Sequence, residues 1–428
     1  MKISRSVLAG HLVVFAVWCA FFVSGATLNN LGLNYSTDTS SGGLKLHPYT
    51  FFTTAAVLVL VSGRRALSHC LRSRQFRVAM IGAALTVAIL VLKATAGAGQ
   101  SLGFAVDTIV AAFLLAAVLP LVPPVVVGRL SVIALSFVVI ECTLAMVEAV
   151  TQTNLIPIDT WYGAYFRATA LHGHPLNNAL VLVTVATALQ VYARRWVSVL
   201  IFMISVGALI AFGGRGALAA YLLVNAICFA RFGLLSAQRA LILMVGSILG
   251  VVGLSWLILS GLFGDRLVQV GAYDDSSQVR VQSLEILPHL NWPQILFGNN
   301  SDDIVRLMDQ ANVGVIENFL VGYLLTFGLV LTGVIFYCVY KTCAVVLATG
   351  GRAPRWRMLT VLFVFTGTAL TNNSLVTKTP ALYLLIVGLW CASSRFSKHV
   401  EPASLHVEVR TPARPPHSIT RRDPVNET

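Results

Sequence analysis

Long apolar stretches alternate with short polar segments over most of this chain. An α-helix needs about 20 mainly apolar residues to cross the hydrocarbon core of a bilayer, and most of the stretches approach this length. The pattern therefore predicts an all-α fold, a polytopic integral membrane helix bundle with about twelve spans. The expected spans are 7–27, 49–63, 78–96, 103–123, 130–150, 173–193, 196–212, 216–232, 240–262, 316–340, 358–372 and 379–394.

The last two stretches, 358–372 and 379–394, are short and flank the polar run from Thr371 to Ser374. Two short helices joined by a polar turn can form a re-entrant hairpin instead of two complete spans. The sequence leaves both arrangements open.

Basic residues indicate the orientation of the predicted helices, because cytoplasmic loops of membrane proteins keep an excess of Lys and Arg. With the N-terminus inside, 22 of the 30 Lys and Arg residues fall on the inner side. Both termini are thus predicted to be cytoplasmic. The inner groups are Lys2 and Arg5; Arg64, Arg65, Arg72, Arg74 and Arg77; Arg129; Arg194 and Arg195; Arg231 and Arg239; Lys341, Arg352, Arg355 and Arg357; and the C-terminal tail.

The composition supports a membrane protein and excludes an ordinary soluble one. Hydrophobic residues make up 57% of the chain and charged residues 11%, too few to cover the surface of a soluble core. The net charge of +13 suggests a polyanionic partner, but its basic residues are spread over inner loops and tail. Attraction to anionic membrane lipids explains that distribution, so no nucleic-acid partner is expected.

The cysteines and the first apolar stretch narrow the chemistry further. All seven cysteines fall in predicted spans or on the inner side, so no disulfide is expected in the outer loops. No Cys and His spacing suggests zinc, and no metal site is expected. The first stretch lacks a small-residue cleavage pattern and is expected to remain as a span.

Two segments differ from the rest of the transmembrane bundle, which is expected to comprise residues 1–395. Residues 396–428 mix charged residues with five prolines, and this composition predicts a disordered cytoplasmic tail. Residues 264–315 form one large outer, periplasmic loop. Connections of this length are more often functional than idle, so a lid over an outer cavity is expected.

The outer loop contains signals for helices. Ser276 and Ser277 can cap a short helix through Leu287, and Pro288 would stop it. Asp302 and Asp303 follow Ser301 in a pattern that resembles a helix start more than a cation site.

Four short motifs lie at predicted outer span ends or in the outer loop. They are Arg-Ala-Thr-Ala-Leu-His-Gly-His-Pro at 167–175, Gly-Gly-Arg-Gly-Ala-Leu-Ala-Ala at 213–220, Ser-Ser-Gln-Val-Arg at 276–280, and Glu317-Asn318-Phe319 followed by Tyr323 and Phe327-Gly328. Their order, and the spans that separate them, resemble the O-antigen ligase-like superfamily. The resemblance covers about residues 130–340.

This superfamily comprises O-antigen ligases and polymerases of O-antigen and exopolysaccharide repeat units in the bacterial inner membrane. The resemblance implies a membrane glycosyltransferase that moves undecaprenyl-diphosphate-linked glycan to an acceptor glycan hydroxyl at the periplasmic face. It implies no nucleotide sugar, metal or other cofactor. Other polysaccharide assembly proteins are a further class of partner.

The resemblance also assigns roles to residues. Arg167, Arg215 and Arg280 would bind the donor diphosphate, because the planar guanidinium pairs with phosphate oxygens and stays charged. Arg215 would also stabilise the charge of the departing diphosphate.

In the ligases of this superfamily a histidine occupies the position that corresponds to Glu317. A carboxylate can also take the proton of an attacking hydroxyl, so Glu317 is the expected catalytic base. This difference favours a polymerase over a ligase. His172, His174 and Asn318 are expected to support the site.

Each of these residues also has a structural interpretation. Arg167 and Arg280 could simply pair with nearby carboxylates. Glu317 could act as a helix cap and have no catalytic role. His172 and His174 are expected to shape their turn or to bond to backbone instead of binding metal.

Two further pairs of charged residues lie inside predicted spans. Glu141 and Glu148 are seven residues apart and share a helix face, where they could line a glycan path or serve a structural role. Lys93 and Asp107, near the outer ends of consecutive spans, are expected to neutralise each other.

Two other classes of protein remain as alternatives. A polysaccharide transporter or flippase would also have about twelve spans, but it should show inverted repeats and helices broken at mid-membrane, and neither is recognisable in the sequence. A non-enzymatic scaffold would leave the outer arginines unexplained.

Overall fold

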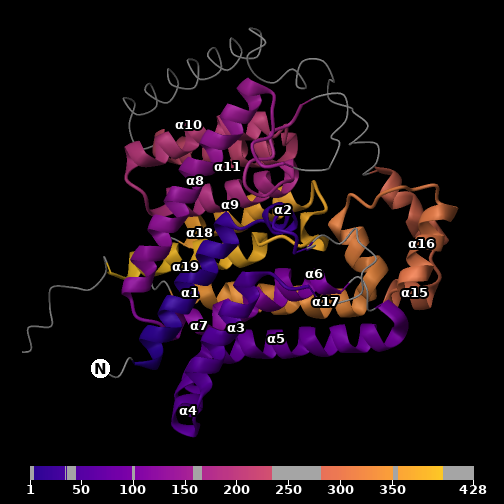
Figure 1. Ribbon diagram of the computed structural model, residues 1–428, viewed down its shortest axis with the longest axis horizontal. Helices are drawn as coiled ribbons and strands as arrows, with labels where there is room; N and C mark the ends of the chain where they lie inside the picture. The colour runs from indigo at the N-terminus through magenta and orange to yellow at the C-terminus, as the bar shows by residue number, and fades with distance from the viewer. Residues whose placement is uncertain are drawn as a thin grey trace, which may run out of the picture.

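The computed structural model describes residues 4–33, 35, 45–98, 102–157, 166–233, 281–349 and 355–398. All regular structure in these residues is helical, which confirms the predicted all-α fold. In Figure 1, α5 runs along the lower edge with α17 next to it, while α15 and α16 form a lobe at the right end.

The long helices follow the predicted apolar stretches. They are α1 (Arg5–Phe22), α3 (Pro48–Val61), α5 (Arg74–Lys93), α7 (Ala111–Val118), α8 (Val125–Thr151), α9 (Pro175–Tyr192), α10 (Arg195–Ala211), α11 (Arg215–Gly233), α17 (Phe319–Ala348), α18 (Arg355–Ala369) and α19 (Ala381–Lys398). The short helices are α2 (Gly25–Asn30), α4 (Arg64–Arg72), η1 (Ala94–Ala98), α6 (Gly103–Ala105), η3 (Val106–Val110), η4 (Leu119–Leu121), η5 (Ser283–His289), α15 (Trp292–Phe297), α16 (Ser301–Gln310) and η6 (Ser374–Val376).

Six helical segments among the described residues are long and apolar enough to cross a membrane. The bent pair α3 and α4, with an angle of 107°, would make a seventh if it counts as one span. The apolar stretches of α10, α11, α18 and α19 are shorter, namely Arg195–Ala211, Arg215–Phe229, Trp356–Ala369 and Ala381–Ser394. The chain is therefore compatible with a multi-pass membrane protein, whereas the predicted number of twelve is not confirmed. The expected span 240–262 lies outside the described residues.

Local sequence signals explain several helix starts. Ser4 and Ser73 are the N-caps of α1 and α5, and their side chains accept hydrogen bonds from the backbone of Val7 and Phe76. Pro48 and Pro175 occupy the first positions of α3 and α9, where a missing backbone N–H costs nothing.

Helices α9 and α19 form the centre of the bundle. Every side chain from Asn178 to Leu189 and from Ala381 to Leu389 is buried, as expected for helices that are apolar on all sides. A Cβ on Gly388 would lie only 2.7 Å from the Cβ of Ala188, so the two helices approach closely at this glycine. Neighbours of α19 include α7, α8, α17 and α18.

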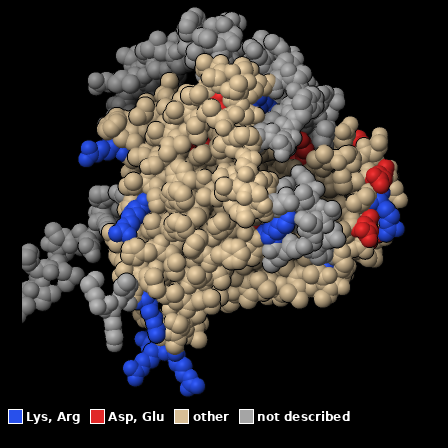
Figure 2. Space-filling model, viewed as in Figure 1, with Lys and Arg blue, Asp and Glu red and all other residues tan. Residues whose placement is uncertain are grey.

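The basic helix ends gather on one side. The guanidinium of Arg5 at the start of α1 donates to the carbonyl of Ser62 at the end of α3. Most Lys and Arg atoms visible in Figure 2 lie at the left and lower left, whereas most Asp and Glu atoms lie toward the right. The first residues of α1 and the end of α19 lie on the left as well (Figure 1). Which side faces the cytoplasm stays a prediction.

Two expectations about segments change in detail, and a third is confirmed. Helix α19 extends to Lys398, so the predicted tail 396–428 begins within a helix, and residues 399–428 lie outside the described residues. The predicted stop at Pro288 is wrong, because Pro288 lies inside the 3-10 helix η5. The start at Ser301 is confirmed, since α16 begins there with Asn300 as its N-cap.

The described part of the predicted outer loop, residues 281–315, packs against the bundle. Ile286 and Leu307 from the loop pack with Val321 and Leu325 of α17 in a small core of their own. The lid therefore stays a prediction for residues 264–280, which lie outside the described residues.

Candidate functional site

Two buried glutamates hold the segment that follows Arg167. One carboxylate oxygen of Glu148 accepts hydrogen bonds from the backbone N–H groups of Thr169, at 2.7 Å, and Ala170, at 2.8 Å. Its other oxygen accepts from Leu155 N–H at 2.9 Å. Glu141, two turns earlier on the same face of α8, accepts from Leu171 N–H at 3.2 Å. Glu141 and Glu148 therefore have a structural role: they hold the backbone of the predicted Arg167 motif in place.

Asn178, in the first turn of α9, also holds this segment. Its side-chain oxygen accepts from the backbone N–H of His172 at 3.0 Å, and its amide nitrogen donates to the carbonyl of Thr169. The turn between them needs unusual backbone angles, with φ of 35° at Ala170 and 68° at Gly173. A non-glycine residue with positive φ is uncommon and persists only where the surroundings enforce it.

Arg167 joins this segment to the end of α10. Its Nε donates to the carbonyl of Phe212 at 3.0 Å, and the next residue, Ala168, donates its N–H to Ala211 at 3.1 Å. Its positive charge also reaches His174: burial first, and then Arg167, lower the pKa of this imidazole to about 4. Arg167 is half-buried and therefore sits at the rim of the bundle.

Arg215 begins α11 directly after a tight glycine turn. Gly213 has φ of 63°, and a Cβ on Gly214 would lie 3.1 Å from the Cβ of Ala179 on α9. Gly216 lies against Thr371, whose Oγ1 would be only 2.5 Å from an added Cβ. The small residues around Arg215 therefore permit α9 and segment 371–376 to approach the backbone of this turn closely.

Glu317 and Asn318 lead into α17. The N-cap of α17 is Asn318, whose side chain accepts from Leu320 N–H at 2.9 Å. The backbone N–H of Glu317 donates to the hydroxyl of Ser283 at 3.2 Å. Glu317 is half-buried and directly precedes the cap.

The segment 371–376, between α18 and α19, connects the arginine turn with the Glu317 segment. Its first residue, Thr371, packs against Gly216. The carbonyl of Asn372 accepts from Phe319 N–H at 3.3 Å, and the Asn373 amide donates to the Ile316 carbonyl at 3.4 Å.

Three of the four predicted motifs are thus brought to one end of the bundle through direct contacts. Arg167 bonds to Phe212 beside the Arg215 turn, and segment 371–376 links that turn to Glu317. Arg280 lies outside the described residues, three positions before Ser283. No pattern in the sequence indicated that segment 371–376 would connect the two motifs.

The two histidines belong to the same turn. His172 Nε2 lies 3.4 Å from the carbonyl oxygen of Ala20, and its ring meets Phe137 edge to face. Burial lowers the pKa of His172 to about 4. These contacts agree with the expected bonding to backbone, and the described residues contain no group of three His, Cys, Asp or Glu that could hold a metal.

The expected pairing of Lys93 with Asp107 is wrong. Asp107 accepts instead from Tyr35 Oη and Thr50 Oγ1, each at 2.6 Å, and from His47 N–H at 3.1 Å. Lys93 Nζ donates to the carbonyl of Phe297 at 3.2 Å. Hydroxyl and backbone donors from a distant part of the chain satisfy the carboxylate, and their spacing carries no signal in the sequence.

Comparison of the chain with models of known protein families finds no match, and a search of curated proteins finds no match either.

Proposed function

We propose that this protein is a membrane glycosyltransferase that uses a lipid-diphosphate-linked glycan as donor and a sugar hydroxyl as acceptor. The observation that carries the proposal is the assembly of the Arg167 segment, the Arg215 turn and the Glu317 segment at one end of the bundle. These are the segments that resemble the motifs of the O-antigen ligase-like superfamily.

The proposed roles follow from the chemistry of these side chains. Arg167, Arg215 and Arg280 bind the oxygens of the donor diphosphate, and Arg215 stabilises the charge that develops on it. A half-buried guanidinium at the end of a membrane bundle lies at the depth of a lipid headgroup. His172 and His174 shape the turn that presents Arg167, and Asn318 fixes the start of α17 beside Glu317.

The reaction is a single displacement. The acceptor oxygen forms a bond to the anomeric carbon while the bond from that carbon to the diphosphate oxygen breaks, and the bonding electrons leave with the lipid diphosphate. The acceptor proton passes to the carboxylate of Glu317. The configuration at the anomeric carbon is inverted, and no covalent sugar intermediate forms.

The acceptor class has two candidates within this proposal. Glu317 in place of the histidine of ligases favours a polymerase of O-antigen or exopolysaccharide repeat units over a ligase that uses the lipid A core. A flippase is the non-enzymatic alternative, because it would also bind a lipid-linked glycan.

The test of the diphosphate site uses purified protein in liposomes with undecaprenyl-diphosphate-linked repeat units. We expect longer glycans without added nucleotide, and no product from Arg215→Ala. Arg215→Lys should restore little activity, because an ammonium cannot pair bidentately with phosphate oxygens. Arg306→Ala is the matched control, since this exposed arginine of α16 pairs only locally with Asp303. Movement of intact donor across the membrane without a new glycosidic bond would contradict the transferase and favour the flippase.

A second test addresses Glu317. General-base assistance contributes roughly 10²–10⁴ in rate, so Glu317→Gln should lose most turnover while still binding donor. Glu317→His introduces the residue of the ligases and should recover part of the rate. Near-normal product from Glu317→Gln would remove Glu317 as the base.

A further inference from the structure

Helix α15 is apolar and yet exposed. Its sequence is Trp-Pro-Gln-Ile-Leu-Phe, and none of its six side chains is buried. Trp292 is 75% exposed and Phe297 is 58% exposed. Large apolar side chains held this far in the open indicate that another apolar phase or a partner covers them.

The position of α15 is fixed by the segment that follows it. Backbone and side-chain N–H groups of Asn299 both donate to the carbonyl of Leu325 in α17, at 2.7 and 3.0 Å. The backbones of Gly298 and Gly328 approach so closely that a Cβ on either would lie within about 2.5 Å of the other segment's backbone. The exposure of α15 therefore belongs to a firmly docked helix.

This docking point lies at a break inside α17, one of the helices long and apolar enough to cross a membrane. Helix α17 is broken at Gly328, with φ of 71° and ψ of 174°. Residues 329–348 beyond the break provide the roughly 20 residues that cross a bilayer. Lys93 at the end of α5, a second crossing helix, donates to the carbonyl of Phe297. Helix α15 thus lies level with the ends of two crossing helices.

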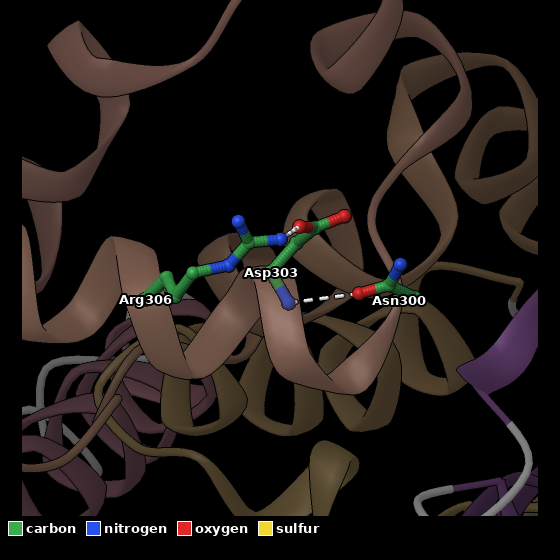
Figure 3. Close-up of polar contacts among 3 residues, drawn as sticks. All are labelled: Asn300, Asp303 and Arg306. Carbon is green, nitrogen blue, oxygen red and sulfur yellow. Dashed lines mark hydrogen bonds and ion pairs between the residues drawn. The ribbon is translucent and has the colours of Figure 1, made fainter.

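The adjacent helix α16 presents a different surface. Asp302, Arg306 and Asp309 are exposed on it, and Figure 3 shows Asn300 capping the helix while Arg306 pairs with Asp303. In Figure 2, red and blue side chains stand out in the region of α16 at the right edge, whereas the region of α15 below it is tan. The lobe therefore has a charged face and an apolar face.

We propose that α15 is an interfacial membrane helix that seats Trp292 and Phe297 in the headgroup boundary of the bilayer that the bundle crosses. Helix α5, which bonds to α15 through Lys93, also exposes apolar side chains directly before this lysine, at Val91 and Leu92. Tryptophan is enriched at this depth of a membrane. The capping box of Asn291 and Gln294 satisfies backbone donors at the start of α15, which lowers the cost of placing it next to lipid.

Lipid seating would hold the lobe from Ser283 to Glu317 at headgroup depth. At that depth the lobe would lie beside the headgroup of a lipid-linked donor, and this consequence rests on the proposed function. The insertion of α15 into the membrane does not rest on it. The following test measures insertion alone, so either idea can fail without the other.

The test places a nitroxide label at Trp292→Cys or Phe297→Cys in the full-length protein, reconstituted in nanodiscs of phosphatidylethanolamine and phosphatidylglycerol. The background carries Cys228→Ala, because the other six native cysteines are buried. Val305→Cys on α16 is the matched control, since Val305 is 57% exposed, like Phe297. We expect labels on α15 to be relaxed several-fold more by oxygen than by a water-soluble nickel chelate, and the control label to show the reverse.

Two outcomes would overturn the proposal. Labels on α15 that respond to nickel as strongly as the label at 305 would place the helix in water. Labels protected from both reagents would indicate a second copy or another protein on this surface. Where a cysteine variant fails to fold, the native protein gives the same answer: Trp292→Phe should remove a component of tryptophan emission that brominated lipids quench.

Discussion

The side chain of Glu148 accepts hydrogen bonds from backbone N–H groups that lie outside any helix. Removal of this single side chain should therefore destabilise the protein. Glu148→Ala would leave the N–H groups of Leu155, Thr169 and Ala170 without their acceptor. Thr169 and Ala170 are fully buried, and each buried donor left unsatisfied costs about 1–3 kcal/mol. We expect a clearly lower melting temperature of the purified protein and loss of glycan transfer. Glu285→Ala makes the same change at an exposed position of η5, and it should leave both unchanged.

The two histidines of the same turn predict a dependence of stability on pH. The pKa of His172 and that of His174 are each lowered to about 4, from 6.5 in an exposed imidazole. Between pH 4 and pH 6.5 the two histidines bind more protons in the unfolded chain than in the folded one. Their contribution to the free energy of unfolding is therefore fully present above pH 6.5 and is lost as the pH falls toward 4. We expect the melting temperature to fall between about pH 7 and pH 5, and to fall less in His172→Gln. An equal decrease of melting temperature with falling pH in the native protein and in His172→Gln would contradict the contribution of His172.

At the scale of elements, sequence patterns predicted the helices better than their contacts. Apolar length alone placed α1, α5, α8 and α9 within about five residues of their observed bounds. The link from Arg215 through Thr371 to Phe319 joins residues that are more than 50 positions apart. Such tertiary contacts leave no local period in a sequence, so only the presence of the motifs could be predicted, and not the connection between them.

That connection can be tested at Gly216. In Gly216→Ala the new Cβ would lie 2.5 to 2.7 Å from three atoms of the Thr371 side chain, so segment 371–376 must shift. We expect lower stability and little glycan transfer. Thr371→Gly in the same chain removes all three atoms and should restore much of both. Gly333→Ala in α17 is the control, because nothing lies within 4 Å of its added Cβ, and it should fold normally.

The result of this cycle discriminates between two interpretations of segment 371–376. Recovery in the double variant would show that the contact itself transmits the defect. A loss of activity in Gly216→Ala that persists in the double variant would mean that α11 needs glycine there for another reason.

At the scale of the whole molecule, the distribution of charge predicts which end of the bundle faces the periplasm. The exposed arginines of α4 lie at the opposite end from the lobe with α16 (Figures 1 and 2), and cytoplasmic ends of membrane proteins carry the excess of basic residues. Asp309 on α16 and Arg65 on α4 are both exposed, so a cysteine can be introduced at each position for labelling. In cells with a permeable outer membrane, a membrane-impermeant maleimide should label the first directly and the second only after the inner membrane is opened. Labelling in the reverse order would invert the topology and would move Arg167, Arg215 and Glu317 to the cytoplasmic side, where a periplasmic transfer reaction could not use them.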